Sequence, residues 1–278
     1  MVERENIRLR RECGYPYPWT DDRILQDYKF TNVKRKHDRV SKEFESWYQA
    51  HPKASGRQIV YNAAFARYFG RPEFVISAGW QRTHNPENIV PLAREWLDRG
   101  GKVFTGAYMI TNLGRLGPKE EFVVNDVLSE VWERAPKIAS IIKHTQSWGA
   151  AHAELSKCLG FGGTGFMGKE VLLDTMYTDL WEDKPADWGT WCPVGPGALR
   201  GLNRLAERPK QKGLTQAKAL SELIQVWNNI RLLWPSGWEP LDLHDVQFQL
   251  CEFDKYERAR LGEGRPRGRY HPPKETTR

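Results

Sequence analysis

The sequence is poor in the features that mark several protein classes. Its four cysteines lie far apart and form no CxxC pair: Cys13, Cys158, Cys192 and Cys251. This spacing argues against a zinc knuckle or an iron–sulfur loop, so no metal site is expected, and it suits a reducing compartment. No apolar run approaches the length of a membrane span, and the charged start "MVERENIRLRRE" shows no signal peptide. We therefore expect a cytoplasmic protein without membrane contact.

Strand–helix alternation, which would indicate an α/β fold, is also missing. The spacing of apolar residues and the positions of capping residues predict helices over 21–28, 32–48, 57–69, 86–99, 120–135, 136–148, 169–181, 197–208, 215–234 and 242–260. Only segments 72–77 and 102–111 resemble strands. We therefore expect an all-α fold, with one helical domain over residues 1–261 in a single body or in two lobes.

Positive charge is what the sequence has in excess. The formal net charge is +7 and the isoelectric point is near 9.2, which favours a polyanionic partner such as nucleic acid. The last residues, 262–278, are rich in Gly, Pro and Arg and carry little that could be buried. They are expected to form a basic flexible tail that either contacts the DNA backbone or is merely solvated.

Glycine is concentrated in "CLGFGGTGFMGKEVLLDTMY", residues 158–177, which fits three nucleotide- or DNA-binding patterns. A P-loop requires a preceding strand and a Ser or Thr after its lysine, but segment 147–160 is predicted to be helical and Glu170 follows Lys169. A Rossmann turn requires a strand as well. The remaining pattern is a DNA-binding hairpin between two helices, in which glycine amides bind phosphate; its glycines are Gly160, Gly162, Gly163 and Gly165. An ordinary interhelical loop is the alternative.

The segment "LLDTMYTDLW" after these glycines resembles the "VDT" segment of helix-hairpin-helix DNA glycosylases. In that family the Asp acts at a flipped-out nucleotide, so the resemblance implies that Asp174 is a catalytic carboxylate. Asp174 lies closer to the hairpin than in that family, and the hairpin carries extra residues.

Five ordered segments across most of the chain resemble a narrower family, the α-glutamyl/putrescinyl thymine pyrophosphorylases. This family is also described as the helical domain associated with 5-hydroxymethyluracil DNA kinases. The segments are "GYPYPWTDDRILQDYKFTNVKRKHDRVS", "KVFTGAYMI", "GFGGTGFMGKEVLLD", "VGPGALRGLN" and "LCEFDKYERARLGEGRPRGRY".

The resemblance implies a glycosylase-like fold that acts on modified thymine in double-stranded phage DNA, inside an infected bacterial cell. The implied reaction replaces a pyrophosphate on the base with an amine or amino acid. The implied partners are that donor and a separate 5-hydroxymethyluracil DNA kinase. No cofactor is required by the pattern, although Mg²⁺ could accompany pyrophosphate. Base flipping would expose the substituent.

Candidate phosphate ligands and base-reading groups follow from spacing within these segments. Arg35, Asp38 and Arg39 are expected on one helix face, where the carboxylate could hold two guanidiniums for a pyrophosphate. Arg200, in the first turn of a helix after a Pro/Gly segment, is expected at a second anion site. Lys169 is a further candidate phosphate ligand. Asn32 and Tyr108 are candidates for contacts with a base edge. A surface ion cluster and an ordinary turn are the alternatives.

The last predicted helix carries the second candidate catalytic group. Glu252, Lys255 and Tyr256 share one face, where a carboxylate beside an amine and a phenol could bind the donor or act as a base. A solvated i,i+3 pair is the alternative. His152, which lies among alanines, is expected to be structural.

Two other functions remain open at this stage. A DNA glycosylase would use Asp174 to excise the base and leave an abasic site. A non-catalytic DNA-binding partner of a kinase would use the same polar residues for phosphate contacts alone.

Overall fold

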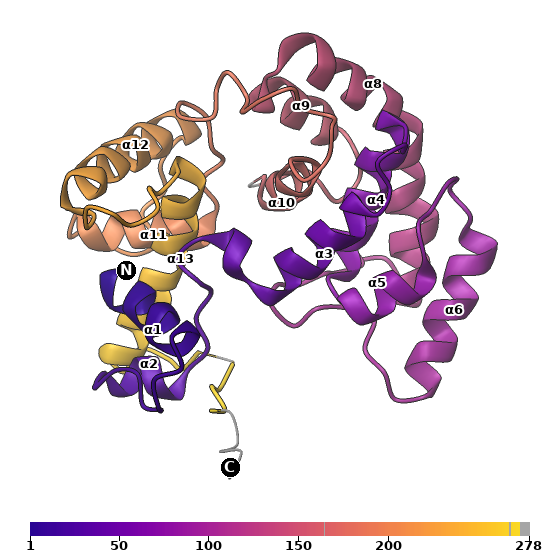
Figure 1. Ribbon diagram of the computed structural model, residues 1–278. Helices are drawn as coiled ribbons and strands as arrows, with labels where there is room; N and C mark the ends of the chain where they lie inside the picture. Colours follow the sequence, from indigo (N-terminus) through magenta and orange to yellow (C-terminus); the bar gives the residue numbers. More distant parts are fainter. Residues whose placement is uncertain (164, 267, 273–278) are drawn as a thin grey trace. The chain divides into compact units, whose positions relative to one another are not determined.

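The computed structural model describes residues 1–163, 165–266 and 268–272, which form helices joined by loops (Figure 1). These residues contain no β-strand, only an isolated antiparallel bridge between Tyr28 and Arg269. The all-α prediction is therefore confirmed. No helix in this part of the chain is long and apolar enough to cross a membrane. The chain divides into two compact units, a terminal unit of residues 1–38 and 194–278 and a central unit of residues 39–193.

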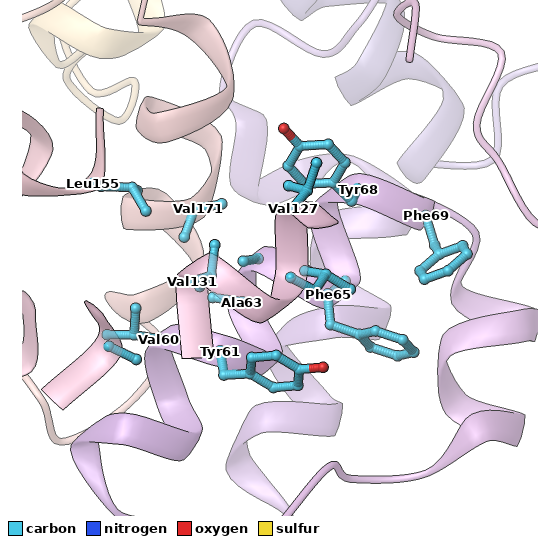
Figure 2. Close-up of a cluster of buried hydrophobic side chains, with 14 of the residues drawn as sticks. Val60, Tyr61, Ala63, Phe65, Tyr68, Phe69, Val127, Val131, Leu155 and Val171 are labelled. Atoms are coloured by element: carbon cyan, nitrogen blue, oxygen red, sulfur yellow. The ribbon is translucent and has the colours of Figure 1, made fainter. Parts of the chain in front are cut away.

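The central unit is built around α4 (Gly56–Phe69), which is buried on almost every side. It begins at a capping box between Ser55 and Gln58 and ends at Gly70, whose φ of 61° is left-handed. Its side chains pack against those of α8 and α10 (Figure 2). The other elements are α3 (Arg39–Gln49), α5 (Pro72–Ala78), α6 (Pro86–Asp98), α7 (Lys119–Glu121), the π-helical η2 (Phe122–Leu128), α8 (Ser129–Thr145), α9 (Trp148–Leu155) and α10 (Phe166–Thr175).

The terminal unit is built around α13 (Leu243–Arg260), which packs against α11 (Pro196–Leu205) and α12 (Gln216–Leu233). Gly201 allows α11 to approach closely, because a Cβ there would lie 2.4 Å from the carbonyl oxygen of Leu250. α1 (Val2–Glu12) is tied to α13 by Arg4, which donates to the Gln249 side chain at 2.6 Å. The remaining elements are α2 (Arg23–Asp27) and the 3₁₀ helix η1 (Arg35–His37).

Three local predictions are wrong. The helix expected over 32–48 begins only at Arg39, because the side chain of Asp38 accepts from the Asn32 backbone at 2.9 Å and folds the preceding residues into a turn. Segment 72–77 is helix α5, opened by a proline at its first turn. Segment 102–111 forms no regular element, because its backbone bonds instead to the end of α4, with Thr105 N donating to Phe69 O at 2.7 Å.

Two residues of the expected tail, Gly268 and Tyr270, are bonded to the rest of the terminal unit, and the flexibility of the tail stays a prediction. Lys29 N donates to Gly268 O and Tyr270 N donates to Asp27 O, both at 2.9 Å. The Tyr270 ring stacks on Tyr17 with centroids 6.2 Å apart. Backbone hydrogen bonds and this ring contact therefore hold Gly268 and Tyr270 on the terminal unit, although the composition of the segment suggested little to bury. Residues 267 and 273–278 lie outside the described residues.

Candidate functional site

The glycine-rich turn joins α9 to α10 within the central unit. Gly160 and Gly165 have left-handed φ values of 81° and 73°, and a Cβ at either position would collide with a neighbouring side chain. At Gly160 that neighbour is the Tyr68 hydroxyl, only 2.1 Å away. Gly162 and Gly163 have no atom within 4 Å of such a Cβ, so this side of the turn is open. Its phosphate-binding role stays a prediction, and Thr164 lies outside the described residues.

His152 holds the end of the turn in place. Its Nε2 lies 3.0 Å from Gly165 O, and its Nδ1 lies 3.1 Å from the Ser156 hydroxyl. Burial lowers the pKa of His152, although the bond to Gly165 opposes the shift. This geometry supports the structural role expected for this residue.

A cluster of cations surrounds a single carboxylate just before the turn. Glu154 is 3% exposed and contacts Lys157 at 2.6 Å, Arg134 at 3.1 Å and Lys137 at 3.2 Å. These cations, Lys157 foremost, hold the pKa of Glu154 at about 2. Because three cations share one carboxylate, this cluster of four side chains carries a net positive charge. Such a charge favours an anionic partner.

The residues after the turn form a buried ionic network. Asp174 has no exposed surface, and both of its oxygens are bonded by Arg67 of α4, with Arg67 Nε donating to Oδ2 at 2.7 Å. The Tyr48 hydroxyl donates to the same Oδ2 at 2.8 Å. Glu170 Oε2 lies 3.7 Å from Arg67. Burial alone would lower the pKa of Arg67, but the Asp174 and Glu170 carboxylates raise it well above its ordinary value.

This network fixes α10 against α3 and α4. A carboxylate whose two oxygens are bonded and enclosed does not meet solvent or substrate in this arrangement, so Asp174 positions helices here. Lys169 is likewise fully buried, on the same helix. Both residues are buried in this structure, and the catalytic role of Asp174 and the phosphate-binding role of Lys169 stay predictions.

Tyr108 belongs to a small cavity beside the glycine turn. Its hydroxyl donates to the Arg67 carbonyl, which links the loop over residues 102–111 to α4. The cavity has a volume of about 190 Å³, and its walls include Tyr68, Phe166 and Gly160. Aromatic walls of this kind suit a planar ring.

A much larger cavity, of about 730 Å³, lies within the terminal unit beside α13. One wall is apolar and comes from α12, with Val226, Ile230 and Leu233. The lining also includes polar groups from α1, α13 and the start of α2: Glu3, Arg4, Asp22, Gln249, Glu252, Tyr256 and Glu257. Carboxylates outnumber cations in this lining. The cavity lining thus combines an apolar surface with acidic groups.

Two of the three predicted residues on α13, Glu252 and Tyr256, line this cavity. Glu252 Oε2 accepts from Lys255 Nζ at 2.7 Å and from the Thr31 backbone at 3.1 Å. The Tyr256 hydroxyl donates to Asp22 Oδ2 at 2.7 Å, and this bond, with burial, raises the pKa of Tyr256 to about 12. Glu252 and Tyr256 line the cavity, whereas Lys255 turns its ammonium to the ring of Phe30, 4.7 Å from the centroid.

The arginines expected to act together at residues 35–39 have separate partners. Arg35 pairs with Asp38 at 2.5 Å, as predicted for one of the two guanidiniums. Arg39 pairs instead with Glu43 at 2.9 Å and Glu73 at 3.3 Å. Asn32 donates through its side chain to His37 O at 2.8 Å, so this amide shapes the turn. Arg200 donates to Asp254 at 2.8 Å in the contact between α11 and α13.

Several side chains that hold these sites together were missed. Arg67 carried a usable signal, because a charge inside the apolar run "NAAFARYF" indicates a buried pair. Arg4 carried none, since its partner Gln249 is distant in sequence, and Asp254 carried only its i,i+4 spacing to Arg258.

Comparison with known proteins places the chain in a family. The family model described as "5-hmdU DNA kinase, helical domain" matches residues 1–265. A "5-hmdU DNA kinase" of Bacillus phage SP10 is 25% identical over 288 residues, which cover 92% of this chain and 43% of the relative. The chain thus spans less than half the length of that protein. No solved structure matches. The resemblance seen in the sequence is confirmed: the chain belongs to the family of 5-hmdU DNA kinase helical domains.

Proposed function

We propose that this chain modifies 5-hydroxymethyluracil-derived thymine in DNA, as a transferase that replaces a pyrophosphate on the base with an amine or amino acid. Family membership and the name of the phage relative support a modified base in DNA as the substrate. Lys169, the lysine of the P-loop-like pattern, is enclosed in α10, which supports a step other than nucleotide-dependent phosphorylation.

The cavity beside α13 is the observation that carries this proposal. Its carboxylates suit an ammonium group, and its α12 wall suits an aliphatic stem. Glu252 is the candidate base, because it lines the cavity and its Oε2 is oriented by Lys255 and Thr31. Asp174, the other candidate, is sealed by Arg67 and Tyr48.

The proposed reaction is a nucleophilic substitution at the 5-methylene carbon of the modified base. The donor nitrogen forms a bond to that carbon, while the bond from carbon to the pyrophosphate oxygen breaks and its electron pair leaves with pyrophosphate. Glu252 accepts the proton that the donor loses. General-base assistance of this kind contributes about a hundredfold or more to a rate.

A second candidate is a DNA-binding module that serves a kinase. It is favoured by the fact that the chain matches only 43% of the phage relative. The glycine turn and the cations around Glu154 would then supply phosphate contacts without chemistry. A glycosylase is disfavoured, because Asp174 lies buried in an ion pair.

Mass spectrometry of digested nucleosides separates these functions. The protein is incubated with duplex DNA that carries pyrophosphorylated hydroxymethyluracil and with a panel of amines and amino acids. Transfer predicts a heavier base still linked to deoxyribose, together with free pyrophosphate. Free base and abasic sites would support the glycosylase. DNA binding without any change in the nucleosides would support the accessory module.

A further inference from the structure

We propose that the buried carboxylate of Asp254 organises a phosphate-binding patch from arginines of α11 and α13. Asp254 is 1% exposed and accepts from Arg200 Nε and Arg204 Nε, each at 2.8 Å. Arg258 Nε lies 3.5 Å from the same carboxylate. Three guanidiniums therefore converge on a single acid inside the terminal unit.

The charges of this patch do not cancel. Besides Asp254, the only carboxylate bonded to it in the described part of the chain is Glu263, which pairs with Arg204 at 2.6 Å and with Lys210 at 2.8 Å. Four cations thus share two carboxylates. The side chains of Arg200 and Arg258 are 37% and 38% exposed. Their terminal Nη groups have no hydrogen-bond partner among the described residues, so these donors are available to a ligand.

The arrangement suits phosphate oxygens more than a carboxylate of the protein itself. Guanidinium forks bind phosphate in bidentate geometry, and a fork that is already oriented loses less entropy on binding. Asp254 orients Arg200 and Arg204 through hydrogen bonds from their Nε atoms, whereas Arg258 contacts the same carboxylate as an ion pair at 3.5 Å and its Nε makes no hydrogen bond to the residues that the structure describes. A simple solvated ion cluster would not require a buried acid.

The phosphate has two plausible sources, the DNA backbone and free pyrophosphate. Only this choice of sources rests on the proposed function. Arg258→Ala and Arg260→Ala form a matched pair, because both arginines lie on α13, yet among the described residues Arg260 forms its ion pair with Glu257 and not with Asp254. The first measurement is affinity for unmodified duplex DNA across a salt series. The second is thermal unfolding with and without sodium pyrophosphate.

If the patch holds the backbone, Arg258→Ala and Arg200→Ala should each weaken DNA binding about tenfold and reduce the salt slope by about 1. If it holds pyrophosphate, the anion should raise the unfolding temperature of the wild type but not of these variants. Arg260→Ala should match the wild type in both measurements. The proposal is overturned if all three variants behave alike. Neither measurement requires base transfer, so a failure of the proposed function would leave this result standing.

Asp254→Asn separates orientation from net charge. Removing a negative charge should strengthen phosphate binding if only charge matters. If Asp254 orients the forks, the variant should bind phosphate less tightly in samples whose circular dichroism shows a native fold. Tighter binding by a folded Asp254→Asn protein would contradict the positioning role. Should this variant not fold, the Arg258→Ala and Arg260→Ala pair decides alone.

Discussion

At the scale of single residues, two carboxylates that look equivalent in the sequence have different surroundings in the structure. Asp174 and Glu252 both follow a motif-like segment, but Asp174 is sealed by Arg67 and Tyr48 whereas Glu252 lines a cavity. Spacing along a helix predicted the Glu252–Lys255 and Arg35–Asp38 pairs, because such pairs are local. Pairing between distant segments depends on the folded chain and could not be predicted in this way.

Asp174→Asn should lower the free energy of unfolding by about 3–5 kcal/mol, since it leaves the buried Arg67 with weakened compensation. Denaturant titration measures this cost. The exposed Asp179 on the following segment provides the control, and Asp179→Asn should change stability by less than about 0.5 kcal/mol. An Asp174→Asn protein of unchanged stability with strongly reduced turnover would instead make Asp174 a catalytic residue.

Asp245 should make stability depend on pH. Burial raises the pKa of Asp245 to about 6, although Lys34 and backbone amides oppose the shift. The folded state therefore binds this proton more tightly than the unfolded state. The resulting stability is fully present below about pH 4 and is lost as the pH rises through about 6.

Denaturant titration of wild type and Asp245→Asn at several pH values tests this expectation. Between about pH 4 and pH 7, the wild type should lose about 3 kcal/mol of stability relative to the variant. A stability difference that stays constant over this range would show that Asp245 ionises normally in the folded protein.

At the scale of elements, helices with strong caps and periodicity were predicted well. The expected helix over 57–69 is α4, bounded by the Ser55 capping box and Gly70. Segment 72–77 was wrongly predicted to be a strand because of its apolar residues, whereas Pro72 opens helix α5. The helical α1 was also missed, since a charged segment gives little apolar periodicity, yet α1 docks through Arg4.

The glycine turn offers a paired test of structure against binding. Gly160→Ala should destabilise the protein by about 2 kcal/mol or more, because it combines a left-handed φ with a collision at Tyr68. Gly162→Ala meets nothing within 4 Å and should leave stability nearly unchanged. If the turn binds DNA phosphate, the methyl group added by Gly162→Ala should weaken DNA binding several-fold, because it would stand between the backbone amides and the phosphate. Wild-type affinity of Gly162→Ala for DNA would argue against that role.

At the scale of the whole molecule, the sequence predicted the fold class and the family. It did not reveal that the candidate sites are divided between two compact units. The glycine turn and the Asp174 network belong to the central unit, whereas the cavity beside α13 and the Asp254 patch belong to the terminal unit. The terminal unit combines both ends of the chain, so its cavity arises from segments more than 200 residues apart. Such a cavity has no local signature in the sequence.

The central claim is that base transfer depends on the Glu252 cavity. Its most direct test is the rate at which wild type, Glu252→Gln and the control Glu12→Gln form substituted nucleoside on pyrophosphorylated hydroxymethyluracil DNA, followed by mass spectrometry. Glu12 lies on α1 in the same unit, is exposed, pairs with Arg8 and does not line the cavity. We predict that Glu252→Gln loses about a hundredfold or more in rate while it still binds DNA, and that Glu12→Gln stays within a fewfold of wild type. Equal rates for Glu252→Gln and wild type would contradict the account.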